Sequence, residues 1–414
     1  GMNPRLYSYM GQFDDFFPNN KGAFKKKIIL KVSDYRSALI QGKFLAKKGI
    51  WVSEYRIESG LNCGGHAFAT DGFLLGPVLA EFKEKRQELK ASIQSLLNQE
   101  LLNQGRTAPE TLSLEITAQG GVGTQEEHSF LMDHYNLDSV GWGSPFLLVP
   151  EATTVDDKTI QKLAKAKEED LYLSDISPLG IPFNNHRDNT KDTEKENNIN
   201  KGRPGSACPK RFVALNKEFK EKGICTASRE YQHLKLKELE SQELPLEIYQ
   251  TKFNKIVEKS CTCVGLGTSA LLAYNLDTKT EGEGVSICPG PNLAYYSKIM
   301  SLKNITDHIY GRANVITRTD RPNMFIKELQ IYMDFLKNKL EEAKVSMSKK
   351  EEKYLKTFTK NMTEGISYYH HLFSGLKHKF EGIKEIVLTE LETNANTLQQ
   401  INKDIERLLI PVKA

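Results

Sequence analysis

The chain has 414 residues, of which 39% are hydrophobic and 27% charged, and its formal net charge at pH 7 is +4. A chain of this length can bury more than one core, so we expect several domains. The small net charge does not favour nucleic-acid binding, and no apolar run reaches the length of a membrane span. Six cysteines without a disulfide framework favour a reducing compartment, so we expect a cytoplasmic α/β protein.

The first part of the chain alternates between strand and helix patterns. Lys27–Val32 predicts a buried strand, and Ser33 is a good N-cap for a helix that ends near Gly49. Ile50–Tyr55 predicts a second strand, and helical spacing predicts a long helix over Leu75–Leu102. Such units with short connections are typical of a parallel sheet.

Two further strand–helix units follow. The apolar strand pattern of Leu114–Ala118 runs into the glycine segment Gly120–Thr124, and an amphipathic helix pattern comes next. The apolar residues of that helix fall on one side: Phe130, Leu131 and Tyr135. A short strand over Ser139–Gly143 then leads into a turn at Ser144 and Pro145.

Glycine-rich loops thus follow two consecutive predicted strands. Small residues let backbone N–H groups approach a phosphate, and the next helix presents its positive end to it. At the carboxyl ends of barrel strands, such loops hold phosphorylated ligands. We therefore expect a phosphate site, most simply for FMN, formed by Gly120, Gly121, Gly123, Thr124, Gly141, Gly143 and Ser144. The alternative for Gly120–Thr124 is an ordinary tight turn between strand and helix.

The number of strand–helix units limits the architecture. A closed (β/α) barrel needs about twice the four units found here. Leu171–Ile176 predicts one more strand, which does not complete the count. We expect barrel-like parallel strands in an apparently incomplete barrel; the alternatives are a partner chain that completes the barrel and an open α/β sheet.

The composition divides the chain further. Residues His186–Ser206 are almost entirely polar and predict a mobile surface loop or boundary. Helical patterns begin at Pro322 and continue over Glu351–Leu372 and Leu376–Leu409, which predicts a helical hairpin, a small bundle or a dimerisation element. The expected domains are a β/α domain in 1–185, a mixed cysteine-containing α/β region in 186–320 and a helical segment in 321–414.

Three motifs resemble one flavoprotein family. Glu58–His66 resembles the strand ending in Gly-Gly-His of the nitronate monooxygenases (formerly 2-nitropropane dioxygenases) and of the related flavin-dependent enoyl reductases. Ala118–Val122 resembles that family's Ala-x-Gly-Gly-Ile loop, and Val140–Leu147 resembles its Gly-x-Gly-Thr-x-Phe loop. The resemblance covers Lys25–Glu151, about a third of the chain, in the family's motif order, and corresponds to the second half of its barrel.

This resemblance implies an FMN-dependent TIM-barrel oxidoreductase, a monooxygenase or reductase of a small organic substrate. It implies that the phosphate is held by Gly121, Gly123, Gly143 and Ser144, that Gly64 and Gly65 belong to the cofactor site, and that His66 faces the substrate.

The chemistry of His66 also suggests a role that does not depend on the family resemblance. An imidazole at the carboxyl end of a strand, after two glycines, can approach a ligand and exchange a proton near neutral pH. The alternative is a histidine that fixes its own loop by hydrogen bonds.

The cysteines open another alternative. Cys208, Cys225, Cys261, Cys263 and Cys288 could supply thiolates to an iron–sulfur cluster, and two of them precede proline, as some cluster ligands do. Their spacing matches no standard cluster or zinc pattern, and buried cysteine is more commonly a small hydrophobe. We therefore do not favour a cluster on sequence, and no metal ligand is assigned.

The leading expectation is an FMN-dependent oxidoreductase, with the chain as a homo-oligomer or bound to a partner chain. The alternatives are a non-catalytic half-barrel that completes or regulates a partner, and an iron–sulfur protein that uses the 208–288 cysteines.

Overall fold

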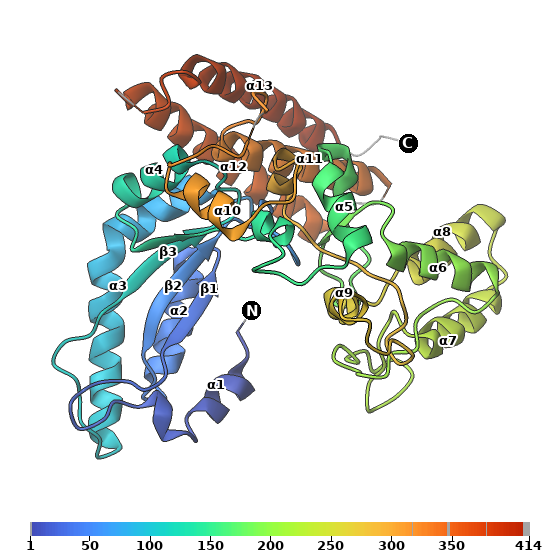
Figure 1. The fold of residues 1–414 in the computed structure, drawn as a ribbon, viewed down its shortest axis with the longest axis horizontal. Helices are drawn as coiled ribbons and strands as arrows, with labels where there is room; N and C mark the ends of the chain where they lie inside the picture. The colour runs from blue at the N-terminus through green and yellow to red at the C-terminus, as the bar shows by residue number, and fades with distance from the viewer. Residues whose placement is uncertain (1, 317, 346–347, 378, 409–414) are drawn as a thin grey trace. The chain divides into compact units, whose positions relative to one another are not determined.

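The computed structural model describes residues 2–316, 318–345, 348–377 and 379–408, which gather into two compact units. Unit 1 is Gly1–Leu61, Ala69–Trp142 and Pro322–Ala414, and unit 2 is Asn62–Phe68 and Gly143–Arg321. Their elements are drawn in Figure 1. None of the helices described has the length and apolar character that a membrane crossing requires.

The domain boundaries expected from the sequence, at 1–185, 186–320 and 321–414, stay a prediction. Each of the two units joins segments that are separated in the chain, so the units do not test where a continuous domain begins or ends. Parts of the last two segments, at 317, 346–347, 378 and 409–414, lie outside the described residues.

The parallel sheet expected from the first half of the sequence is present in unit 1, so the fold is mixed α/β. All neighbouring strands run parallel, with Glu58 paired to Gln119 and Gln119 to Gly141. The strands therefore end along one side of the sheet, which we call the carboxyl edge. In spatial order they are β1 (Ile28–Val32), β2 (Val52–Glu58), β3 (Glu115–Gln119) and β4 (Ser139–Gly141).

Helices connect these strands as the sequence predicts: α2 (Tyr35–Ala46), α3 (Leu75–Asn103) and α4 (Gln125–Tyr135). The apolar side of α4 is buried, as expected from its helical spacing. The N-cap of α2 is Asp34 and not Ser33, because the Asp34 carboxylate accepts a hydrogen bond from the Ser37 N–H at 2.7 Å. Unit 1 also contains α1 (Pro4–Met10) and a short 3-10 helix, η1 (Asp14–Phe16).

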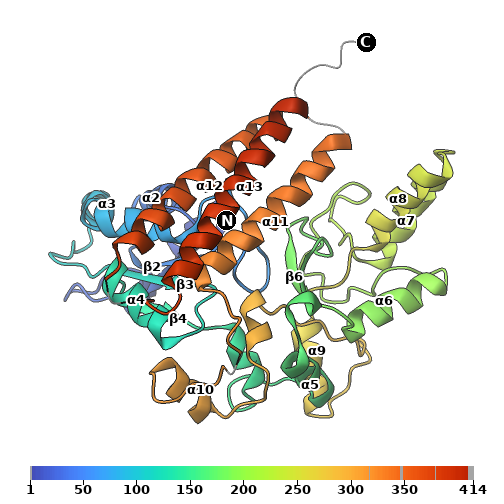
Figure 2. The same ribbon diagram turned by 90° about the horizontal axis from the view of Figure 1, so that it is seen from above.

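The helical patterns at the end of the chain form α11 (Met324–Val345), α12 (Lys349–Gly375) and α13 (Lys384–Leu408). These helices pack on one another, and α12 also packs on α3. Figure 2 shows the three lying side by side. Residues at helical spacing on α11 are fully buried: Phe325, Leu329, Met333 and Leu336. The last helix begins at Lys384 and not at Leu376; residues 378 and 409 of its expected range lie outside those described.

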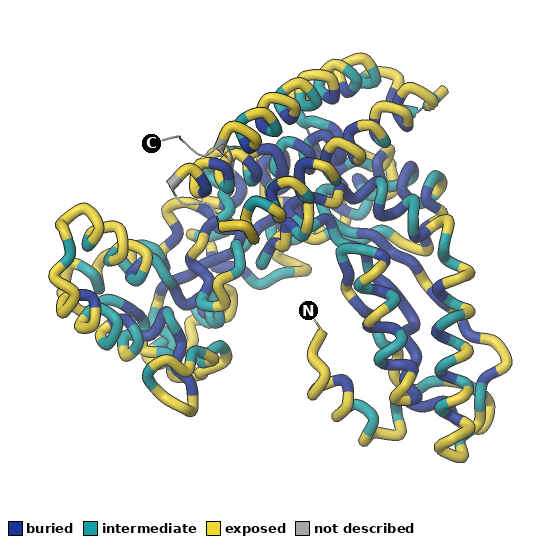
Figure 3. The backbone as a smooth tube through the Cα atoms, turned by 180° about the vertical axis from the view of Figure 1, so that it is seen from behind, coloured by how far each residue is buried: buried dark blue, intermediate teal, exposed yellow. Residues whose placement is uncertain are grey.

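Unit 2 is built from short elements joined by long irregular segments. Figure 3 shows its backbone as a mixture of buried, intermediate and exposed stretches. Its elements are η2 (Ser144–Leu148), α5 (Asp157–Lys165), η3 (Glu168–Asp170), β5 (Leu171–Ser174), β6 (Phe183–His186), α6 (Thr190–Asn200), α7 (Arg229–Glu240), α8 (Leu246–Val257), α9 (Gly265–Ala273), η4 (Pro291–Tyr295) and α10 (Leu302–Ile309).

Two expectations for this region are corrected. The strand expected over Leu171–Ile176 does not extend the parallel sheet, since β5 pairs antiparallel with β6 in a sheet of its own. The polar segment His186–Ser206 is not a loop throughout, because most of it forms α6. Asn189 caps this helix by accepting a hydrogen bond from the Asp192 N–H at 2.9 Å, and the buried Lys191 pairs with Glu194 at 2.9 Å.

A buried carboxyl group joins four elements of unit 1. Glu328, on α11, accepts hydrogen bonds from the Ser59 hydroxyl (2.5 Å), the Leu75 N–H (2.9 Å) and the Tyr369 hydroxyl (3.1 Å). Burial raises the pKa of Glu328 to about 7, and the three donors only partly oppose that shift. The group therefore connects the end of β2, the start of α3, α11 and α12.

We predict that Glu328 makes the stability of unit 1 fall as pH rises. Its pKa is about 4.5 when unfolded and about 7 when folded, so the folded state binds the extra proton between these values. The stabilisation is complete below pH 4.5 and lost as pH rises to about 7, a change on the order of 3 kcal/mol. Denaturant unfolding at several pH values between 5 and 8 measures it.

The variant Glu328→Gln keeps the shape of the group and cannot titrate, so we expect its unfolding free energy to vary less over this range. Glu84→Gln, on the exposed side of α3, is the matched control and should follow the native profile. Parallel profiles for the native protein and Glu328→Gln would contradict the assignment.

Candidate functional site

The expected glycine loop after β3 lies at the carboxyl edge. Gly120 and Gly121 have φ values of 109° and 79°, which side chains disfavour, and they turn the chain from β3 towards α4. Gly141 is the last residue of β4 and pairs with Gln119. The structure therefore brings Gly120, Gly121 and Gly141 to one edge of the sheet, as the sequence predicts for a phosphate site.

The next residues of that loop, Gly123 and Thr124, form hydrogen bonds with Glu127 of the same chain. The Gly123 N–H donates to Glu127 Oε2 at 2.8 Å, and Glu127 Oε1 accepts from the Met324 N–H, also at 2.8 Å. Thr124 is the N-cap of α4 and accepts from the Glu127 N–H at 3.2 Å. A phosphate at Gly123 would have to compete with a buried anionic side chain that is in place.

A sequence signal for this arrangement existed. Thr124 and Glu127 have the spacing of a capping box, in which a glutamate in the first helical turn reaches back to the amide groups before the helix. Here it reaches Gly123, one residue before the cap. The glycine pattern and the capping pattern therefore overlap at Gly123 and Thr124.

The other expected site residues belong to unit 2, where Gly64, Gly65 and Ser144 pack on the turn Cys288–Gly290. The Gly65 N–H donates to the Cys288 carbonyl at 3.0 Å, and the Gly290 N–H donates to the Ser144 hydroxyl at 2.8 Å. A Cβ on Gly64 would lie 2.8 Å from the Cys288 carbonyl oxygen, so this approach requires glycine. A Cβ on Gly143 would meet nothing within 4 Å.

His66 is held by neighbours within unit 2. Its Nε2 lies 2.7 Å from the Ser177 hydroxyl, its ring centroid is 4.8 Å from that of Phe183, and its backbone forms a single bridge to the same residue. These are contacts expected of a histidine that fixes its own loop. A role for His66 towards a substrate stays a prediction.

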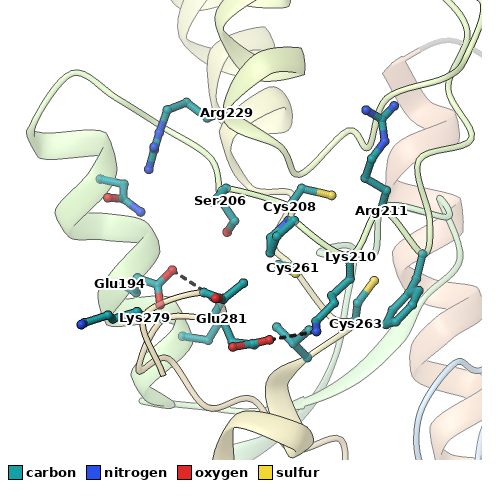
Figure 4. Close-up of a pocket in the computed structure, with 18 residues that line it drawn as sticks. Glu194, Ser206, Cys208, Lys210, Arg211, Arg229, Cys261, Cys263, Lys279 and Glu281 are labelled. Carbon is teal, nitrogen blue, oxygen red and sulfur yellow. Dashed lines mark hydrogen bonds and ion pairs between the residues drawn. The ribbon is translucent and has the colours of Figure 1, made fainter. Parts of the chain in front are cut away.

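Unit 2 also contains a pocket of about 250 Å³ that no sequence pattern predicts (Figure 4). Three of the six cysteines line it: Cys208, Cys261 and Cys263. Charged residues complete much of the lining: Lys191, Glu194, Lys210, Arg211, Arg229, Lys279 and Glu281. Among these, Lys210 and Glu281 form an ion pair at 3.2 Å, drawn as a dashed line in Figure 4.

The thiols at this pocket interact with one another. The neighbouring Cys263 thiol lowers the pKa of Cys261 to about 6, and Lys191 contributes in the same direction. The proximity of Cys261, together with burial, raises the pKa of Cys263. Burial raises the pKa of Cys225 to about 12. None of the cysteines forms a disulfide.

The five cysteines that the sequence offers as cluster ligands do not all lie together in the structure. Cys208, Cys261 and Cys263 line one pocket, whereas Cys288 packs on Gly64 and Gly65. Within the ranges described, no group of three or more His, Cys, Asp or Glu side chains is already arranged to hold a metal ion.

Comparisons with known proteins do not indicate a function for this chain. No protein-family model matches the chain, and no curated protein sequence matches it. The resemblance to nitronate monooxygenases therefore depends on the motifs at 58–66, 118–122 and 140–147 alone.

We predict that Glu127→Ala destabilises unit 1 by about 3 kcal/mol, because two backbone N–H groups lose a buried carboxylate acceptor. Denaturant unfolding measures the change. Gln125→Ala, an exposed position in the same helical turn, should change the unfolding free energy little. Equal effects of the two substitutions would show that Glu127 does not anchor the loop.

Proposed function

We propose that the protein is an FMN-dependent oxidoreductase that acts on a small organic substrate, with its parallel strands as part of a (β/α) barrel. The observation that carries this proposal is the sheet topology. Strands paired in the order β1-β2-β3-β4, all parallel, bring the glycine turn after β3 and the end of β4 to one edge, and barrel enzymes bind phosphate at that position.

The residues at this edge fit a phosphate in part. Gly120 and Gly121, whose backbone angles suit glycine, and Gly141 would bring backbone groups close to it. Gly123 and Thr124 do not fit, since the first donates to Glu127 and the second caps α4. We therefore assign the phosphate to Gly120, Gly121 and Gly141, and leave Gly123 and Thr124 out of its donor set.

Flavin, when bound, supplies the transfer of hydride or electrons, and the chain supplies binding and orientation. The roles of Gly64, Gly65, Gly143 and Ser144 in cofactor binding, and of His66 in proton transfer, come from the family resemblance and stay predictions.

The absorbance spectrum of the purified protein, recorded before and after addition of FMN, tests the proposal. We expect flavin bands that remain with the protein through gel filtration, and a higher Tm with FMN. A free FMN concentration about 100 times the dissociation constant stabilises a protein by about 2.7 kcal/mol. A colourless protein whose Tm is unchanged by FMN would refute the proposal.

A charge placed at the carboxyl edge tests the position of the phosphate. We expect Gly141→Glu to weaken FMN binding by about tenfold or more, through repulsion of the phosphate, and to affect riboflavin much less. Gly375→Glu, at an open position at the end of α12, is the matched control and should bind FMN like the native protein. Equal losses for FMN and riboflavin would place the phosphate elsewhere.

One observation favours a second candidate, a chain that completes or regulates a partner. Among the described strands of unit 1, β1 and β4 are the outer ones, so each offers a side for further pairing. Native mass measurement separates the two candidates. A stable monomer loaded with flavin supports the enzyme, and a colourless chain isolated only with a second protein supports the subunit.

A further inference from the structure

The pocket in unit 2 has an excess of positive charge. More cationic side chains than carboxylates line it, and both carboxylates already have a lysine of the same lining as their partner. Glu194 pairs with Lys191 at 2.9 Å. Glu281 pairs with Lys210 at 3.2 Å. In the described part of the chain, the remaining cations of the lining have no carboxylate partner, and we call them the unpaired cations: Arg211, Arg229 and Lys279.

The thiols of the pocket do not cancel this excess. Cys261, with its lowered pKa, adds at most one negative charge near neutral pH. Cys263 stays neutral, because its pKa is raised. The lining therefore remains positive at neutral pH, and a concave site of one sign concentrates ligands of the opposite sign.

The backbone fixes Arg229 at the wall of the pocket. The Ser206 N–H donates to the Ala227 carbonyl at 2.9 Å, and the Arg229 N–H donates to the Ser206 carbonyl, also at 2.9 Å. Gly205, with a φ of 88°, lets these segments approach, since a Cβ there would lie 2.7 Å from the Arg229 nitrogen. Arg229 is thus placed by the fold before any ligand binds.

The side chain of Arg229 has an unused hydrogen-bond donor. Its Nε is buried and has no hydrogen-bond partner among the described residues. A buried donor without an acceptor costs free energy, and more so when it belongs to a charged group. Lys191, whose side chain is only 3% exposed, adds a buried charge to the same lining. An anionic oxygen in the pocket would accept from Arg229 and lower both costs.

A helix end adds to the positive charge. Val264, the N-cap residue of α9, lines the pocket, and no side chain caps this helix. The N–H groups at an uncapped helix start carry partial positive charge. The start of α9 therefore acts in the same direction as the unpaired cations.

The size of the pocket and the positions of the cations limit the ligand. A volume of about 250 Å³ is below the range of about 300–1,000 Å³ that is usual for drug-sized ligands, so the ligand is small. Figure 4 shows Arg229 and Lys279 on one side of Cys208 and Arg211 on the other. A ligand with acid groups at two positions matches cations on both sides better than a single acid group does.

We propose that this pocket binds a small molecule with two or more acid groups, phosphate or carboxylate, and that the unpaired cations are its contacts. The planar guanidinium of arginine can donate to two oxygens of either group at once. Binding forms hydrogen bonds and ion pairs only, and no covalent bond changes. The proposal concerns none of the residues assigned to FMN, so either proposal can fail without the other.

The test is isothermal titration calorimetry of the full chain with pyrophosphate and with citrate, at about 150 mM NaCl to screen weak surface binding. We expect saturable binding of at least one probe, and binding of acetate, a single carboxylate, at least about tenfold weaker. Pyrophosphate alone would identify a phosphate ligand, citrate alone a carboxylate ligand, and both would support a site open to either. Binding of neither probe, or acetate binding as tight as theirs, would refute the proposal.

Two matched substitutions locate the site. We expect Arg229→Gln to weaken binding of the same probe by about tenfold or more, because a charged hydrogen bond is lost. Arg203→Gln, at an exposed position outside the lining, is the control and should bind like the native protein. Lys279→Gln, in an exposed turn, repeats the test in case Arg229→Gln fails to fold. Equal affinity in all three variants would refute the assignment.

Discussion

The carboxyl group of Glu328 is the interaction on which the architecture of unit 1 depends most. It accepts hydrogen bonds from residues at the end of β2, at the start of α3 and on α12, while it is itself part of α11. This buried carboxyl group thereby joins segments from the N-terminal and C-terminal parts of the chain. Burial raises the pKa of Glu328 to about 7, so the group is protonated far more often than an exposed glutamate near neutral pH, which lowers the cost of placing it in the core.

A second buried carboxylate shows how the same fold limits its own binding sites. A helix N-terminus that follows a glycine loop can attract an external anion, but α4 carries Glu127 in its first turn. The side chain satisfies the amide of Gly123 from within the protein and also binds the backbone at the start of α11. The carboxyl edge is thus divided into a part used for internal structure and a part, around Gly120 and Gly141, that the flavin proposal requires.

Unit 2 is organised differently, with less regular structure and more polar burial. Its irregular segments are held by single bridges and by capped short helices such as α6. Apolar burial orders unit 1, whereas unit 2 also depends on buried polar side chains such as Asn184, which donates to the Cys63 carbonyl at 2.7 Å.

The sequence by itself determined the alternation of β1–β4 with α2–α4 and the long helices α11–α13, because hydrophobic periodicity and capping act over a few residues. It also placed Gly120, Gly121 and Gly141 at the ends of neighbouring strands. Only the tertiary structure decided that β5 pairs antiparallel, that Glu127 accepts from the Gly123 N–H, and that Cys208, Cys261 and Cys263 line one pocket without Cys288. These outcomes depend on which distant segments pack together, and Glu328 shows the reason: its partners lie more than 250 positions away in the chain in two of three cases, beyond the reach of any local pattern.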